Sequence, residues 1–159
     1  VSSNEAANGL LSRIGNGDDK AAIATVTATA QRYGFTSSEE LRTLTGMASG
    51  NAVENWTSTR DCGSFLSQVY AGTLVSKNAS ERMMQLLLGQ TRRTKIPAGV
   101  PSGVKVANKT GELAAVQNDV AIVFGTHPYV LAVMSNDISS AVAPSQITEL
   151  SRAVWDAAQ

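Results

Sequence analysis

The residues that decide the fold are 105–137, which read KVANKTGELAAVQNDVAIVFGTHPYVLAVMSND. Alternating valines lead into a Lys-Thr-Gly triplet (109–111), and two β-rich runs follow at 120–124 and 129–134. The Gly and Pro of residues 125–128 indicate a hairpin turn between these two runs. We therefore expect three antiparallel strands, with the Lys-Thr-Gly strand as the outer neighbour of the second one.

A strand that carries Lys-Thr-Gly has a chemical use. The ammonium of Lys109 can hold an anionic group of a substrate or tune a neighbouring hydroxyl, and Thr110 offers a hydroxyl donor. Gly111 lets a ligand approach the backbone closely. The bare triplet is common, however, so it indicates a site only together with a second motif.

The second motif stands at residues 2–4, Ser-Ser-Asn, directly before a helical pattern. Ser-x-Asn before a helix, followed about a hundred residues later by Lys-Thr-Gly on a strand, gives two of the three elements of the signature of class A β-lactamases and penicillin-binding proteins. Residues 6–8 (Ala-Ala-Asn), the Ile96-x-x-Gly99-x-Pro101 approach to the strand and the terminal helix add to the likeness. The chain therefore resembles this family of active-site serine hydrolases over nearly its whole length.

The third element, Ser-x-x-Lys, carries the nucleophile of the family and precedes Ser-x-Asn. The sequence begins with Val1 and reaches Ser-x-Asn at Ser2, so no such motif precedes it. We expect the nucleophile to lie outside this chain, and we expect the chain alone to be inactive.

The pattern of elements predicts an α+β fold. We expect residues 1–103 to form the helical region, and residues 104–159 to form the strands and the covering C-terminal helix of the same domain. The helices are expected at 4–14, 19–33, 57–70, after a cap at Ser76, and at 144–158, with a short helical turn near 37–44. The resemblance implies two further strands beside 129–134. Without them this apolar edge is expected to pair with the absent segment or with a second copy of the chain.

The helix patterns also predict which residues are buried. In the helix after Ser76 the methionines and leucines of 83–88 look fully buried, and in the last helix Ile147, Leu150, Val154 and Ala157 are expected to face the sheet.

Composition excludes several classes of function. The chain has 159 residues, 13 basic and 13 acidic, and it has no long basic run, so nucleic acid is not an expected partner. Its residues show no His, Cys and carboxylate cluster with metal-ligand spacing, so we expect neither a metal site nor a cofactor. No apolar run is long enough for a membrane span. The resemblance implies a protein of the cell envelope, periplasmic or secreted.

The resemblance also implies catalytic roles. Ser2 would pass a proton to the leaving nitrogen, and Lys109 would keep the hydroxyl of Ser2 acidic enough for this. The backbone N–H of Glu112 would donate to the oxyanion. On the residues alone, helix capping is the favoured explanation of Ser2 and Asn4, and their pairing with Lys109 at the spacing of the family favours the catalytic interpretation.

Substrate contacts follow in the same way. Asn4 would bind the acylamide side chain of the substrate, and Thr110 beside Gly111 would bind its carboxylate. Lys95 and Arg93 lie where some members of the family carry a cation that supports this carboxylate, although a solvated surface charge explains both residues as well.

One departure concerns the loop that follows the second helix. Class A β-lactamases carry Glu-x-x-Leu-Asn there, and this glutamate activates the deacylating water. In this chain Thr45 stands in register with the glutamate, whereas Glu39, Glu40 and Glu54 are out of register. The resemblance implies a β-lactam or a D-Ala-D-Ala cell-wall peptide as the substrate, and without the glutamate in register a D,D-peptidase becomes a serious alternative to a β-lactamase. A non-catalytic module that binds peptidoglycan or a partner is the alternative from another class.

Overall fold

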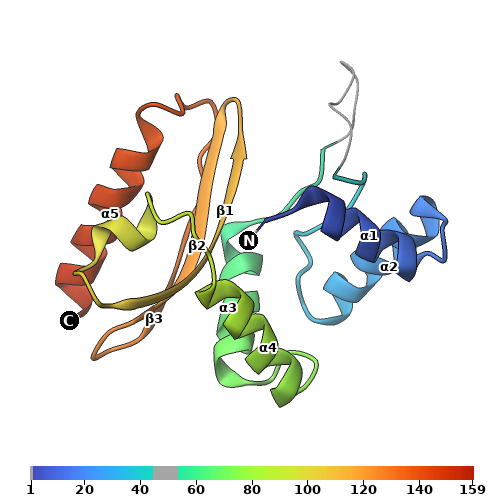
Figure 1. Cartoon of the computed structure of the whole chain (residues 1–159), viewed down its shortest axis with the longest axis horizontal. Helices are drawn as coiled ribbons and strands as arrows, with labels where there is room; N and C mark the ends of the chain where they lie inside the picture. Colours follow the sequence, from blue (N-terminus) through green and yellow to red (C-terminus); the bar gives the residue numbers. More distant parts are fainter. Residues whose placement is uncertain (1, 45–53) are drawn as a thin grey trace. The chain divides into compact units, whose positions relative to one another are not determined.

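The structure is a computed structural model that describes residues 2–44 and 54–159 (Figure 1). The chain divides into two compact units, Ser2–Asp61 and Cys62–Gln159, and each is described by itself. Within the described residues the fold is α+β, with five α-helices and a three-stranded antiparallel sheet. The predicted fold class is confirmed.

The first unit contains the helix pair α1 (Asn4–Ile14) and α2 (Asp19–Arg32), which pack against each other. Ser3 caps α1, because its Oγ accepts a hydrogen bond from the N–H of Ala6 at 3.1 Å. Asp18 caps α2 in the same way, through the N–H groups of two residues in its first turn. The predicted bounds of α1 are confirmed, and α2 ends one residue earlier than predicted.

The short helical turn predicted after α2 is wrong. Glu39 instead forms a β-bridge with Trp56, with backbone N···O distances of 2.9 and 3.0 Å. The side-chain Oδ1 of Asn55 accepts hydrogen bonds from the N–H groups of Leu41 (2.8 Å) and Arg42 (2.9 Å). Side-chain and cross-chain bonds thus satisfy backbone donors that a helix would have satisfied locally.

The second unit is built on strands β1 (Lys105–Leu113), β2 (Val116–Phe124) and β3 (Tyr129–Val133). They are antiparallel neighbours in the order β1-β2-β3, as predicted. The hairpin between β1 and β2 is tighter than expected, because Leu113 already pairs with Val116. The strand β3 lies at the edge of this sheet, and its pairing with another strand stays a prediction.

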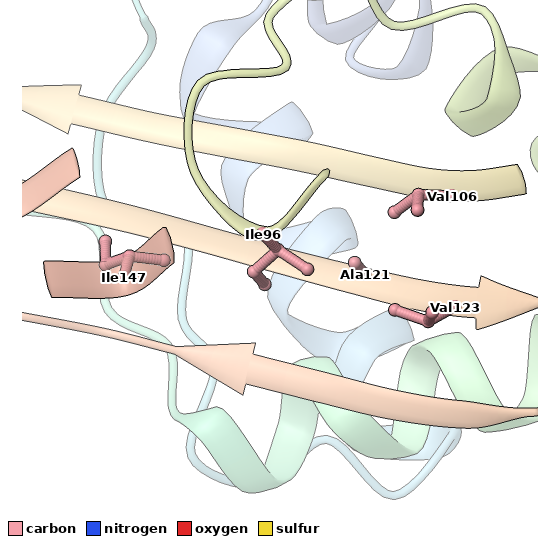
Figure 2. Close-up of a cluster of buried hydrophobic side chains, with 5 residues drawn as sticks. All are labelled: Ile96, Val106, Ala121, Val123 and Ile147. Carbon is pink, nitrogen blue, oxygen red and sulfur yellow. The ribbon is translucent and has the colours of Figure 1, made fainter. Parts of the chain in front are cut away.

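Each face of the sheet carries helices (Figure 1). On one face lie α5 (Ala143–Ala158) and the 3₁₀ turn η1 (Ile96–Gly99), and Figure 2 shows the buried cluster that they form with β1 and β2. Its members are Ile96, Val106, Ala121, Val123 and Ile147. On the other face α3 (Thr59–Ala71) and α4 (Lys77–Leu88) cover a second cluster formed by Leu66, Ala107 and Ile122.

The turn η1 approaches α5 so closely that only small residues fit between them. A Cβ on Gly99 would lie 2.4 Å from the carbonyl oxygen of Thr148 and 2.5 Å from the Cβ of Ser151. Ser151 is fully buried, and its hydroxyl donates to the carbonyl of Ile96 at 2.8 Å. The segment that leads to β1 is therefore fixed against α5.

Two predictions of buried helix faces are wrong in part. In α4, Leu86 is 68% exposed, and the neighbouring methionines and leucines are only half-buried. In α5, Ile147 is buried as predicted, but Leu150 is 46% exposed and Ala157 is exposed too. The buried stripe of α5 runs instead through Ala143, Ile147 and Ser151, because the close approach of η1 favours small side chains.

Candidate active site

The site is built on the free edge of β1, and the direction of its backbone groups follows from the pairing. Glu112 lies opposite Gln117 on β2. The N–H and the carbonyl of Gln117 both bond to the hydroxyl of Ser135, at 3.2 and 2.6 Å, on the side away from β1. Glu112 and Gln117 are therefore a non-hydrogen-bonded pair, and the backbone N–H of Glu112 points outward from the sheet.

Other residues of β1 agree with this direction. The carbonyl of Val106 accepts a bond from Nη1 of Arg93 at 3.4 Å, and the carbonyl of Thr110 accepts one from Nζ of Lys109. Because every second residue of a strand turns its backbone groups to the same edge, residues 106, 108, 110 and 112 all face outward. The backbone N–H of Glu112 therefore points away from β2, and its role as an oxyanion donor stays a prediction.

Lys109 is half-buried. It lies two residues after Ala107 on β1, so its side chain points to the same face of the sheet, which α3 and α4 cover. Burial lowers the pKa of the Lys109 ammonium below its usual 10.5, and the nearby carboxylates of Asp119 and Glu112 oppose this shift. A lysine in this state is more easily deprotonated than a solvated one, which suits proton exchange with a hydroxyl.

The lowered pKa of Lys109 predicts a pH effect on stability. Between the lowered pKa and 10.5 the unfolded chain binds more protons at this residue than the folded chain, so the free energy of unfolding should rise with pH over that window. Lys109→Met removes this contribution. Urea unfolding of both proteins at a series of alkaline pH values should show wild type gaining on the variant as pH rises. A difference that stays flat or falls would contradict it.

Thr110 and Gly111 occupy different environments. Thr110 is 7% exposed, whereas Gly111 is exposed. A Cβ on Gly111 would make only ordinary contact with the side chain of Asn118, at 3.7 Å. Packing within the chain does not require glycine here, so the space beside Gly111 is available to a ligand.

The two cations predicted near the carboxylate subsite differ in their exposure to solvent. Arg93 is exposed. Lys95 is 1% exposed, and its Nζ donates to Oε1 of Glu112 at 3.0 Å and to the carbonyl of Asn118 at 3.2 Å. The solvated-charge interpretation of Lys95 is therefore wrong, and direct contact with a substrate stays a prediction for Arg93. Sequence reasoning missed the contact between Lys95 and Glu112.

Ser2 and Asn4 belong to the first unit. Both are exposed at the start of α1, and the capping oxygen comes from Ser3 between them. Ser2 and Asn4 are thus not explained by capping. Their role beside Lys109 stays a prediction.

A Ser-x-x-Lys spacing does occur later in the chain, at Ser102 and Lys105, and sequence reasoning overlooked it. Residues three apart share one face on a helix. Ser102 instead lies in a turn that continues through Gly103, whose φ is +91°, and Lys105 is the exposed first residue of β1. This pair therefore lacks the helical geometry that would bring a lysine to a serine nucleophile.

The predicted deacylation region is described only in part, because Thr45 lies outside the described residues. The carboxylate of Glu54 is paired with Nη2 of Arg42 at 2.7 Å. Burial raises the pKa of Glu40, and the positive charge of Arg42 only partly opposes this shift. The carboxylate of Glu54 is therefore already engaged by a cation.

In residues 2–44 and 54–159 no helix is both long and apolar enough to cross a membrane. Nor do three or more His, Cys, Asp or Glu side chains gather there in a way that could hold a metal ion.

Comparison with protein families and solved structures gives a consistent result. The model of a family described as "Beta-lactamase enzyme family" matches residues 1–158. No curated protein matches the chain. Among solved structures, a β-lactamase from Sphaerobacter thermophilus matches with a TM-score of 0.86 and 24% identity, over 98% of this chain and 58% of its own.

Two other solved structures are similar. The TLA-3 extended-spectrum β-lactamase matches with a TM-score of 0.84 and 23% identity, over 97% of this chain and 59% of its own. A variant of PBP-A, solved as an acyl-enzyme complex with penicillin G, matches with a TM-score of 0.75 and 24% identity, over 85% of this chain and 51% of its own. The chain thus spans little more than half the length of these proteins.

Proposed function

Because the chain belongs to the β-lactamase enzyme family, we propose that it forms part of a serine hydrolase that takes an acyl group from a β-lactam or a D-Ala-D-Ala cell-wall peptide. The nucleophile of this hydrolase is a serine outside the chain. By itself the chain is inactive.

The observation that carries this proposal is the outward N–H of Glu112 on β1. The half-buried Lys109 lies on the same strand, and Gly111, beside Glu112, leaves space for a ligand. An acyl transfer develops negative charge on the carbonyl oxygen, and a fixed backbone donor stabilises that charge. A strand edge is a suitable place for this donor, because the sheet holds its direction.

The proposed roles follow the resemblance to the family. Lys109 keeps the hydroxyl of Ser2 acidic enough to pass a proton to the leaving nitrogen. Asn4 bonds the amide of the substrate side chain. Thr110 and Arg93 bind its carboxylate, for which a guanidinium offers several donors in one plane.

The kind of hydrolase follows from the loop after α2. Hydrolysis of the acyl-enzyme needs a base that holds a water on the ester, and the register of this loop places Thr45 where the family carries its glutamate. Of the glutamates that are out of register, Glu54 is paired with Arg42. We therefore favour a penicillin-binding enzyme that is acylated faster than it is deacylated. Its place is the cell envelope, periplasmic or secreted, where cell-wall peptides occur.

The test is covalent labelling of the full-length natural protein by a fluorescent penicillin. We expect one label per protein, prevented by prior addition of benzylpenicillin. If the protein binds a D-Ala-D-Ala peptide reversibly and takes up no label, it is a binding module and the proposed function is wrong.

A further inference from the structure

The carboxylate of Glu112 is paired with two cationic side chains. Its Oε1 accepts from Nζ of Lys95 at 3.0 Å, and its Oε2 accepts from Nη1 of Arg92 at 2.9 Å. The side chain of Lys95 is 1% exposed, that of Arg92 is 63% exposed and that of Glu112 is 33% exposed, so Lys95 is the buried member of this group. Removing a buried charge from its partner has a larger effect than breaking an exposed ion pair.

The backbone around Lys95 is fixed from two sides. Its carbonyl accepts a bond from Oγ1 of Thr148 on α5, at 3.2 Å. The next N–H, of Ile96, donates to the buried carboxylate of Asp119 on β2 at 3.0 Å. The ammonium of Lys95 therefore extends from a rigid base.

Lys95 also ties two strands together near their turn. Its second bond goes to the carbonyl of Asn118, and this residue lies opposite Gly111 in the register of β1 and β2. One ammonium thus holds the side chain of Glu112 and the backbone beside its pairing partner. These bonds also lower the pKa of Glu112, with the Lys95 hydrogen bond as the largest cause.

From these contacts we infer that Lys95 is a positioning residue, which fixes the direction of the Glu112 backbone N–H by holding the Glu112 carboxylate and the Asn118 carbonyl together. The inference rests on the proposed function, because it assigns Lys95 to the same site. Lys95 does not touch the substrate. Its effect is on the chemical step, because the N–H serves the charge that develops there.

The variant Lys95→Met keeps the length of the side chain and removes the ammonium. In the full-length protein we expect the limiting rate constant of acylation by a penicillin to fall about 10- to 100-fold, as a small misplacement of a catalytic group does. The concentration for half-maximal rate should change less than threefold. Lys105→Met is the matched control, since Lys105 is an exposed lysine on β1, the strand that carries Glu112, and it should leave both constants unchanged.

A double-mutant cycle separates positioning from general loss of structure. Glu112→Gln removes the charge that Lys95 holds and should also slow acylation, and Lys95→Met with Glu112→Gln should be little slower than either variant alone. If Lys95→Met does not fold, the test uses Glu112→Gln and the rescue variant Lys95→Arg. The limiting rate constant of acylation should then be at least threefold higher in Lys95→Arg than in Glu112→Gln.

The outcomes are distinguishable. If wild type is acylated and Lys95→Met, folded by its melting temperature, is acylated at the same limiting rate, the positioning role is wrong while the proposed function stands. A change confined to the half-maximal concentration would also overturn it, since that would indicate a binding role. If wild type takes up no penicillin, the proposed function itself has failed.

Discussion

Replacing Lys109 by alanine should slow acylation of the full-length protein by a penicillin about 10²–10⁴-fold, the contribution typical of a positioned acid or base. Lys109 is half-buried on the sheet face away from α5, and burial lowers the pKa of its ammonium, so it loses its proton more readily than a solvated lysine. Alanine removes both the charge and the proton.

The measurement is the rate of covalent labelling by a fluorescent penicillin, with the melting temperature of each variant as a check of folding. Lys105→Ala, an exposed lysine on the same strand, is the matched control and should react like wild type. A Lys109→Ala variant that is folded and labelled within twofold of the wild-type rate would show that Lys109 has no part in the chemistry.

The second large effect concerns the fate of the acyl-enzyme. We expect the adduct to persist, with hydrolysis slower by roughly 10²–10⁴-fold than in an enzyme that has a positioned base. The register that places Thr45 at the base position predicts this, and the pairing of Glu54 with Arg42 agrees with it.

The decay is followed by removing free penicillin and recording the fraction of acylated protein with time. Rapid multiple turnover of penicillin would contradict the register that places Thr45 at the position of the base. Glu40→Gln and Glu54→Gln would then show which glutamate serves as the base, because only the variant that lacks it should accumulate the adduct.

The sheet could be predicted from the sequence because its signals are local. Alternation, a Gly and Pro turn and β-branched residues define the three strands, and helix caps such as Ser3 and Asp18 define the starts of α1 and α2. The strand β2 is longer than its apolar run because polar residues also belong to it. Asp119, for example, is fully buried, and its carboxylate accepts bonds from Ile96 and Asn108.

The buried faces of α4 and α5 could be predicted only in part, because apolar periodicity does not reveal what packs on a helix. In α5 the buried face includes Ser151, which is small and polar and lies against Gly99. An analysis that counts apolar residues favours Leu150, which is exposed. Shape complementarity between η1 and α5 decided this face, and it depends on contacts far apart in the chain.

The candidate site, too, could be predicted from the sequence only in part. The motifs that contain Ser2, Asn4 and Lys109 could be found in the sequence because they resemble a known signature and follow its order and spacing. The burial of Lys95 could not, because its partner Glu112 lies 17 residues away, and a lysine is usually exposed. A buried lysine paired with a distant carboxylate is a tertiary feature that no local pattern encodes.

The most direct test of the account is to locate the penicillin adduct. The full-length protein is reacted with benzylpenicillin, its intact mass is recorded, and the adduct is mapped by peptide mass spectrometry. We predict one adduct per protein, on a serine that precedes Ser2 in a Ser-x-x-Lys motif, and none in Lys109→Ala over the same reaction time. An adduct on Ser2 or Ser102, or the absence of any adduct in wild type, would contradict the account.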